Sequence, residues 1–363
     1  MSGRITGLEL VNFRSHLKTH VHFDGRPVAI MGPNGAGKTN LLEAISLFSP
    51  GRGLRRADRE AYGRQPENLG WKISLTAIID DLVHIVNSAK AGEARQVMIN
   101  DKSATQTAMG HYLRMVWMTP AQDRIWIDSA TDRRKFFDRI VLSFFPNHGE
   151  NVLAFEKGMR ERNKLLKDGV FDEHWYFVTE ARMAEAAKII VSNRAEAIAR
   201  LNAEMILSET IFPVAELTLD YNIDNPLDHD WAQMWAQDRQ QDRYAGTTKR
   251  GPHRVNCQSV YVTKSQNAAL CSTGEQKALL ISLMLANARA LIADGHFVTV
   301  LLDEVAAHLD EDRRALLFDE ICALDAHVLM TGTEAELFHA LSDRGQYFEV
   351  REDASISQVK ELK

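Results

Sequence analysis

One short segment of the chain has glycines, a lysine and a hydroxyl side chain spaced for binding phosphate. Residues 32–39 are Gly32, Pro33, Asn34, Gly35, Ala36, Gly37, Lys38 and Thr39, which match the pattern G-x-x-x-x-G-K-[ST]. In this pattern backbone N–H groups wrap around the phosphates, the lysine reaches the terminal phosphates and the hydroxyl binds Mg²⁺. An apolar run at 28–31 precedes the segment and a helical pattern at 40–48 follows it. This order favours a loop that binds ATP and Mg²⁺ over a glycine-rich turn beside an unrelated lysine.

Two adjacent acids, Asp303 and Glu304, follow a second apolar run at 298–302. In a phosphate-loop protein, one acid at such a strand end orders Mg²⁺ and the next polarises the attacking water. Taken alone, the pair is as well explained as a solvated strand end. Because a phosphate loop lies upstream, we predict that Asp303 and Thr39 hold the metal and that Glu304 and Lys38 act in ATP hydrolysis.

A third segment opens a helical pattern about 30 residues before the two acids. Its residues are Ser272, Thr273, Gly274, Glu275 and Gln276. Serine and threonine favour helix N-termini, so an ordinary capped helix explains the segment in structural terms. The segment also resembles the signature of ATP-binding-cassette ATPases, whose helix N-terminus contacts the γ-phosphate held by a second subunit. That resemblance implies an ATP-dependent, head-to-tail homodimer, and it implies that Asp310 belongs to an aspartate loop at the dimer interface.

Strand and helix patterns place these segments in an α/β fold. Alternating apolar residues predict two half-buried strands before 28–31 and an antiparallel meander from 71 to 99, with a turn at Asn100 and Asp101. Strand patterns return at 217–221, 297–302, 328–330 and 347–350, and helical patterns at 275–293 and 334–341.

Helical periodicity dominates from about residue 128 to residue 207 and divides into three helices. The third has a coiled-coil-like seam made by Phe177, Ala181, Ala184, Val191, Ala195, Ile198 and Met205. We therefore expect an ATP-binding-cassette-type ATPase head, a mixed sheet with flanking helices, in two parts at residues 1–125 and 211–363. An inserted helical arm would occupy residues 126–210.

Composition indicates a folded protein of a reducing compartment. Apolar residues make up 45% of the chain and charged residues 25%, which argues against disorder. The three cysteines are far apart and form no Cys-x-x-Cys pair, so they favour neither a disulfide framework nor a zinc site. We see no signal-peptide core and no run of about 18 apolar residues. We therefore expect a cytoplasmic protein with no membrane partner.

Further segments resemble one family of DNA-repair ATPases. Residues 8–14 resemble the start shared by RecF and SMC-type ATPases, and Thr331-Gly332-Thr333 stands where transporters of the cassette class have a histidine. Other matches occur at 51–55, 119–123, 133–138, 162–166, 251–254 and 309–314. Cys271, before the signature, departs from the leucine or phenylalanine more common in the family. On these segments, which span almost the whole chain, the sequence resembles the RecF family.

The resemblance implies a slow, DNA-stimulated ATPase of recombinational repair. Such a protein dimerises with ATP on duplex or gapped DNA, works with RecR and promotes RecA loading on single strands. Gln122 lies in the segment where a glutamine that senses the γ-phosphate is expected. The alternatives are an ATPase subunit of a transport or regulatory complex, and a nucleotide-gated scaffold with negligible turnover.

The charge distribution indicates where DNA would bind. The chain carries a net charge of −6, but residues 1–66 contain ten Lys/Arg against five Asp/Glu, whereas residues 296–363 contain six against fifteen. Arginines cluster after the phosphate-loop helix at Arg52, Arg55, Arg56 and Arg59, with Arg64 beyond them. We predict that this loop contacts DNA phosphates with little sequence preference. The alternative is a solvated loop partly neutralised by Asp58 and Glu60.

Overall fold

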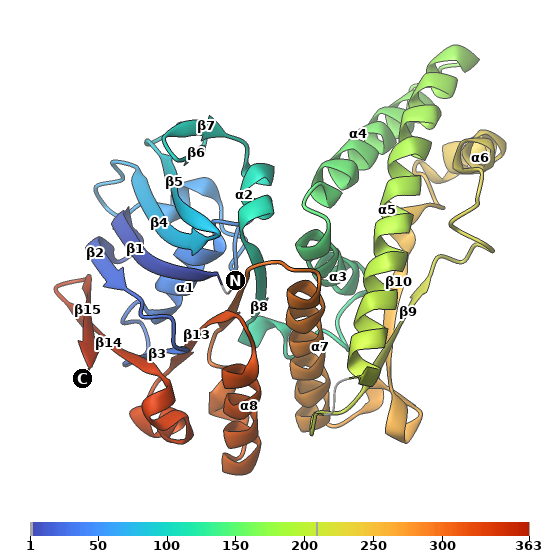
Figure 1. Cartoon of the computed structure of the whole chain (residues 1–363). Helices are drawn as coiled ribbons and strands as arrows, with labels where there is room; N and C mark the ends of the chain where they lie inside the picture. The colour runs from blue at the N-terminus through green and yellow to red at the C-terminus, as the bar shows by residue number, and fades with distance from the viewer. Residues whose placement is uncertain (1–2, 208–209, 363) are drawn as a thin grey trace. The chain divides into compact units, whose positions relative to one another are not determined.

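The computed structural model describes residues 3–207 and 210–362, which form two compact units (Figure 1). The head unit comprises Met1–Asp123, Ser208–Phe212 and Leu280–Lys363, and the arm unit comprises Arg124–Leu207 and Pro213–Leu279. Helix α7 (Thr273–Ala293) begins in the arm unit and continues into the head unit.

The first sheet of the head unit is antiparallel and has the strand order β2-β1-β4-β5-β6-β7. The strands are β1 (Arg4–Phe13), β2 (His16–His22), β4 (Trp71–Ile79), β5 (Asp81–Ala89), β6 (Gln96–Ile99) and β7 (Lys102–Ala104). A register shift between Ile5 and Gly7 explains why the buried residues Ile5 and Leu8 of β1 are three positions apart. The predicted turn is confirmed, because Asn100 and Asp101 have φ angles of 48° and 61° between β6 and β7.

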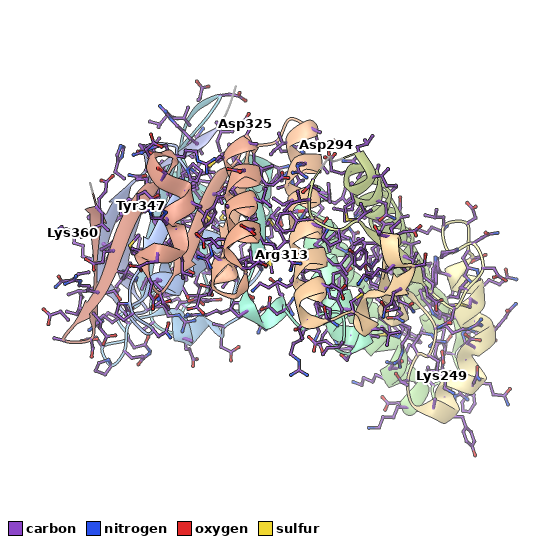
Figure 2. All side chains as sticks on the ribbon, turned by 90° about the horizontal axis from the view of Figure 1, so that it is seen from below. Lys249, Asp294, Arg313, Asp325, Tyr347 and Lys360 are labelled. Atoms are coloured by element: carbon purple, nitrogen blue, oxygen red, sulfur yellow. The ribbon has the colours of Figure 1, made fainter. Side chains whose placement is uncertain are left out.

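The second sheet has the order β15-β14-β3-β13-β12-β8 and is parallel except for β15. Its strands are β3 (Val28–Met31), β8 (Arg114–Met118), β12 (Val298–Leu302), β13 (His327–Gly332), β14 (Gln346–Asp353) and β15 (Ile356–Leu362). Tyr347 and Lys360, labelled in Figure 2, mark the two C-terminal strands. Parallel strands end at one edge of a sheet, so residues that follow β3, β12 and β13 lie together there.

Helix α1 (Lys38–Ser46) packs into the core that the two sheets share. Leu41 and Ile45 of α1 are buried in one cluster with Leu8 of the first sheet and Ile30 of the second. Shorter elements complete the head unit: η1 (Arg59–Tyr62), α2 (Gln106–Tyr112), η2 (Pro120–Gln122), η6 (Val305–His308), α8 (Glu311–Ala323) and η7 (Ala335–Arg344). The helix predicted at 334–341 is the 3₁₀ stretch η7, which Ser342 interrupts with a φ of 49°.

The arm unit contains the three predicted helices, α3 (Ala130–Phe144), α4 (His148–Lys167) and α5 (Glu173–Leu207). It also contains α6 (Trp231–Ala245) and a small sheet of β9 (Ala215–Asp220), β10 (Asn256–Tyr261) and β11 (Gln266–Asn267). The 3₁₀ turns η3 (Pro252–Arg254), η4 (Val262–Lys264) and η5 (Ala268–Leu270) connect these later elements.

The expected domain boundary at residue 211 differs from the structure. Residues 213–279 belong to the arm unit and not to the C-terminal part of the head. The physical reason is shared burial, since Trp231, Trp235 and Val255 lie in one hydrophobic cluster with Phe155 of α4 and Ile190 of α5. The sequence pattern missed α6 because polar residues surround its two buried tryptophans.

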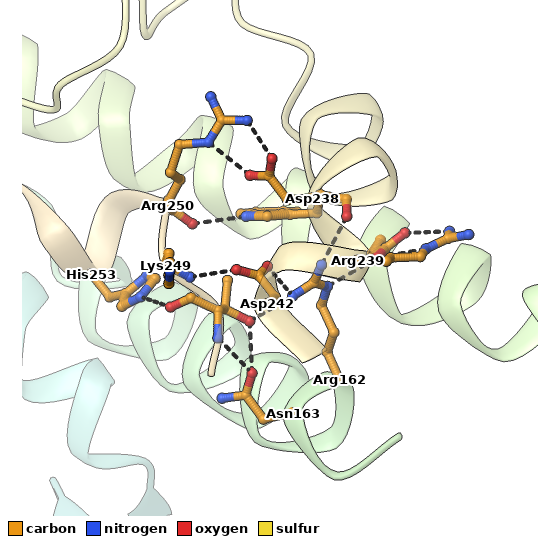
Figure 3. Close-up of polar contacts among 11 residues, drawn as sticks. Arg162, Asn163, Asp238, Arg239, Asp242, Lys249, Arg250 and His253 are labelled. Carbon is orange, nitrogen blue, oxygen red and sulfur yellow. Dashed lines mark hydrogen bonds and ion pairs between the residues drawn. The ribbon is translucent and has the colours of Figure 1, made fainter. Parts of the chain in front are cut away.

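The buried face of α5 agrees with the predicted seam at Ala184, Val191 and Met205 but differs from it elsewhere. Phe177 is 69% exposed, whereas Glu180 and Arg194 are each 2% exposed. The Arg162 guanidinium of α4 donates to Glu180 at 2.9 Å, and Arg239 of α6 donates to the same carboxylate at 2.6 Å (Figure 3). Charged residues therefore take buried positions that a purely apolar repeat assigns to the surface.

The matched segments at 162–166 and 251–254 belong to this polar network (Figure 3). The Thr248 N–H donates to the Asn163 Oδ1 at 2.9 Å, and the Thr248 carbonyl lies 3.1 Å from His253 Nε2. Arg194 donates to the Pro252 carbonyl at 2.7 Å. These contacts link α4, α5 and the segment after α6, so in this structure the two motifs hold the arm unit together.

Helix α7 is one candidate membrane span among the described residues, by length and composition alone. In its most apolar window 83% of the residues are buried within the structure. Buried core helices meet the same criteria, so this helix is weak support for a membrane span.

Candidate active site

The loop between β3 and α1 requires glycine at two positions where a neighbouring segment approaches closely. Gly37 has a φ of 106°, and a Cβ there would lie 2.2 Å from Ser357 Oγ. Gly32 has a φ of 147°, and a Cβ there would lie 2.1 Å from the Val350 carbonyl oxygen. Only glycine adopts such angles readily and leaves this space, so the loop can wrap tightly over the sheet edge.

Lys38 lies under this loop, with its side chain almost fully buried. Its Nζ donates to the carbonyl oxygens of Gly32 at 2.7 Å and Pro33 at 3.0 Å. Burial lowers the pKa of Lys38, while the negative charges of Glu304 and Asp303 oppose that shift. The ammonium group is thus held in the hollow of the loop, within electrostatic reach of both predicted acids.

Asp303 follows β12 and meets hydroxyl groups from two other segments. Thr39 Oγ1 and Thr331 Oγ1 each donate to Asp303 Oδ1 at 2.8 Å. Asp303 is only 7% exposed, so these two hydrogen bonds fix its carboxylate at the sheet edge.

Glu304 adopts the left-handed backbone conformation, with φ 53° and ψ 22°, and begins the 3₁₀ turn η6. Its N–H donates to Thr331 Oγ1 at 3.0 Å. The two predicted acids are therefore held by the same threonine, which stands at the end of β13.

Mg²⁺ fits the donor atoms at this point. Thr39 and Asp303 present a hydroxyl and a carboxylate oxygen, which are hard ligands, and Mg²⁺ in phosphate sites binds one or two such groups along with the phosphates. Among the described residues no cluster of three or more His, Cys, Asp or Glu side chains forms a separate metal site.

Two residues that the sequence analysis did not identify, His16 and Ser357, form hydrogen bonds to backbone carbonyls of the phosphate loop. His16 Nε2 lies 3.2 Å from the Gly37 carbonyl and its Nδ1 lies 3.0 Å from Thr19 Oγ1. Burial lowers the pKa of His16 to about 4, so the ring is neutral and donates through Nε2. Ser357 of β15 donates to the Ala36 carbonyl at 2.6 Å. No sequence pattern identifies these residues, because they act through contacts between distant strands.

Two arginines of the loop after α1 have partners within the head unit. Arg52 is 69% exposed and lies 3.4 Å from Asp58, so the neutralisation considered above holds for that residue. Arg55 donates to the Asn40 Oδ1 at 2.8 Å and lies 3.4 Å from Glu43. Arg56 is exposed, with a φ of 52°, and the side chain of Arg59 lies outside the described part of the structure.

Gln122 and Asp310 have local partners in the head unit. The Gln122 Oε1 accepts from the Thr119 N–H at 2.8 Å, within a capping box. Asp310 caps α8 by accepting from the Arg313 N–H at 2.9 Å. These contacts explain both residues structurally, so their predicted roles at the γ-phosphate and at a dimer interface stay predictions.

The signature segment lies in the arm unit and starts α7. Ser272, Thr273 and Gly274 are exposed, and the Ser272 N–H donates to the Glu275 Oε2 at 2.9 Å. Hydrogen bonds from Lys264 and Ser272 lower the pKa of Glu275 to about 2. Gln276 is buried, and its amide donates to the Cys271 carbonyl at 3.1 Å. The structure thus gathers Lys38, Thr39, Asp303 and Glu304 in the head unit and places residues 272–276 in the other unit.

Comparison with known proteins identifies the family. The family model described as RecF/RecN/SMC N terminal domain matches residues 4–355. A Rhizobium etli protein named "DNA replication and repair protein RecF" is 42% identical over 365 residues, covering 95% of this chain and 96% of the relative. The chain belongs to the RecF family. A RecF protein of Brucella suis biovar 1 is 41% identical over 364 residues, with 95% of this chain and 94% of the relative covered.

Solved structures agree with the predicted fold class. "Structure of the recombination mediator protein RecF-ATPrS in RecFOR pathway" has a TM-score of 0.84 at 19% identity, covering 100% of this chain and 99% of that one. An Smc head domain from Pyrococcus furiosus has a TM-score of 0.57 at 16% identity, covering 99% and 96%. The predicted cassette-type ATPase head and the predicted RecF family are therefore confirmed.

Proposed function

We propose that the chain is an ATPase of recombinational DNA repair that binds ATP and Mg²⁺ in the head unit. The 2.8 Å contact between Thr39 and Asp303, residues 264 apart in sequence, carries this proposal. It joins the phosphate-loop hydroxyl to the acid after β12, at the place where Lys38 is held. The names of the RecF relatives, which refer to DNA replication and repair, favour this function over a transport role.

Each residue has a definable task in this mechanism. Backbone N–H groups of residues 32–39 surround the phosphates, and Lys38 exchanges its contacts with the Gly32 and Pro33 carbonyls for phosphate oxygens. Thr39 and Asp303 would hold Mg²⁺, which would supply positive charge beside the phosphates. The Glu304 carboxylate accepts a hydrogen bond from the attacking water and orients it toward the γ-phosphate.

A second molecule completes the site in this proposal. Residues 272–276 form the N-terminus of α7, where Ser272, Thr273 and Gly274 are exposed, and the positive end of the helix dipole there suits a γ-phosphate. ATP then bridges a homodimer, and hydrolysis releases it. Asp310 lies at the dimer interface and Gln122 senses the γ-phosphate.

DNA binds through the arginine loop, where Arg52, Arg55, Arg56 and Arg59 contact backbone phosphates. The dimer assembles on duplex or gapped DNA in the cytoplasm, works with RecR and promotes RecA loading. Similar solved structures are of RecF as a recombination mediator in the RecFOR pathway, which supports this assignment. DNA stimulates the slow hydrolysis.

The ATPase rate should therefore be measured against added duplex, gapped duplex and single-stranded DNA. We expect gapped or duplex DNA to raise the rate, and we expect Lys38→Arg to abolish ATP-driven dimerisation. Equal rates with and without any DNA would refute the DNA-dependent function. Unchanged dimerisation of the Lys38→Arg variant would refute the ATP-bridged dimer.

A further inference from the structure

Thr331 is a buried hydroxyl that contacts both predicted acids. It is the penultimate residue of β13 and is 1% exposed. Its Oγ1 donates to Asp303 Oδ1 at 2.8 Å and accepts from the Glu304 N–H at 3.0 Å. A threonine hydroxyl has one proton, so these two bonds define its orientation.

The contact to Glu304 supports an unfavourable backbone conformation. Outside glycine, asparagine and aspartate, the left-handed conformation costs about 1–2 kcal/mol, and Glu304 adopts it at φ 53° and ψ 22°. The turn occurs where the sheet ladder ends, because the Asp303 N–H still pairs with the Met118 carbonyl at 2.9 Å while the Glu304 N–H turns to Thr331. Thr331 thereby replaces the backbone partner that the strand lacks at this point.

The second hydrogen bond of Thr331 orients Asp303, the acid predicted to hold the metal. Thr39 and Thr331 donate to the same carboxylate oxygen, from α1 and from β13. If Mg²⁺ takes the place of the Thr39 proton donor, the Thr331 hydrogen bond still orients Asp303. One side chain therefore fixes the metal-holding acid and the turn that carries the water-polarising acid.

We propose that Thr331 is a positioning residue for hydrolysis, which holds Glu304 and Asp303 in register without touching the nucleotide. This role rests on the proposed ATPase function. Loss of the hydroxyl then leaves the phosphate loop and Lys38 intact, so ATP binding persists. The hydrolysis step suffers, because Glu304 no longer has a fixed direction toward the water.

The test compares Thr331 variants with the wild type by steady-state ATPase assay and by nucleotide binding. Thr331→Val keeps the shape of the side chain and removes both hydrogen bonds, so kcat should fall roughly 10- to 100-fold, the usual cost of losing an outer-shell partner. KM and the affinity for ATP should change less than about three-fold, and the ATP-bound dimer should persist longer, because its hydrolysis is slower. Thr331→Ser, which restores the hydroxyl, should recover kcat to within about three-fold of the wild type.

Thr299→Val is the matched control. Thr299 lies on β12, is fully buried, and its hydroxyl has no hydrogen-bond partner within the described residues. The same chemical change there should leave kcat unaltered. If Thr331→Val misfolds, as judged by circular dichroism and Tm, Thr331→Ala replaces it with the same expected loss of kcat.

The proposal is overturned if Thr331→Val or Thr331→Ala hydrolyses ATP at the wild-type rate. It is also overturned if Thr331→Ser is as impaired as Thr331→Val, or if ATP affinity falls together with kcat. Failure of the proposed function looks different, because the wild-type protein itself would then show no ATP hydrolysis.

Discussion

Replacing Arg162 with methionine should destabilise the arm unit, because its guanidinium group is fully buried among two carboxylates. Arg162 donates to Glu180 at 2.9 Å, to Asp242 at 2.7 Å, to Thr248 at 2.8 Å and to the Trp235 carbonyl at 2.8 Å. Methionine replaces the apolar stem of the arginine side chain but supplies none of the guanidinium donors. The variant therefore leaves buried acceptors without their partner.

The expected loss of stability depends on the hydrogen bonds that Glu180 and Asp242 retain in the variant. Removing one member of a buried ion pair costs about 3–5 kcal/mol. Glu180 retains Arg239 at 2.6 Å, whereas Asp242 retains only the Lys249 N–H at 3.0 Å among the contacts that the structure describes. We therefore expect a loss of about 3 kcal/mol in the free energy of unfolding, at the lower end of that range.

Urea denaturation followed by tryptophan fluorescence measures this loss, since Trp231 and Trp235 lie in the arm unit core. At a slope of about 1–3 kcal/mol per molar urea, the midpoint should fall by about 1–3 M. Arg160→Met is the control, because Arg160 is on the same helix, 66% exposed and 3.8 Å from Glu156. It should cost less than about 0.5 kcal/mol. An equal loss in both variants, or a loss below about 1 kcal/mol for Arg162→Met, would refute the reasoning.

Three further predictions concern the head unit. Burial lowers the pKa of His327 to about 4 from the ordinary 6.5, so the neutral ring contributes stability above pH 6.5 that is lost as the pH falls toward 4. Thermal unfolding across this window should show His327→Leu less sensitive to acid than the wild type, and an unchanged pH profile would contradict this. Gly37→Ala should weaken ATP binding at least about 10-fold, because its Cβ would clash with the Ser357 side chain and displace the loop. Gly7→Ala, whose added Cβ would have no contact nearer than 3.9 Å, should leave ATP binding unchanged, and calorimetry distinguishes the two variants. The double change Arg52→Glu and Arg56→Glu should weaken DNA binding and reduce the slope of log affinity against log salt by about 2, with ATP affinity unchanged. An unaltered slope would move the DNA site elsewhere.

The parts of the fold that local patterns describe could be predicted from the sequence. Buried strands such as 28–31 and 298–302 are continuous apolar runs, and the phosphate loop has a spacing that few other structures use. Elements stabilised by buried polar residues could not be predicted in the same way. The face of α5 is shifted from the apolar seam because Glu180 and Arg194 find buried partners that the sequence of α5 does not reveal.

In the candidate site too, contacts between distant segments could not be predicted from local sequence patterns. Lys38, Thr39 and the two acids have local signals, but the groups that hold them come from strands whose neighbours depend on the sheet order. Ser357 reaches the Ala36 carbonyl because β15 pairs with β14, and β14 lies beside β3. Thr331 reaches Asp303 because β13 lies between β3 and β12. Chemistry that one segment supplies can thus be read from spacing, whereas the positioning of that chemistry requires the topology of the sheet.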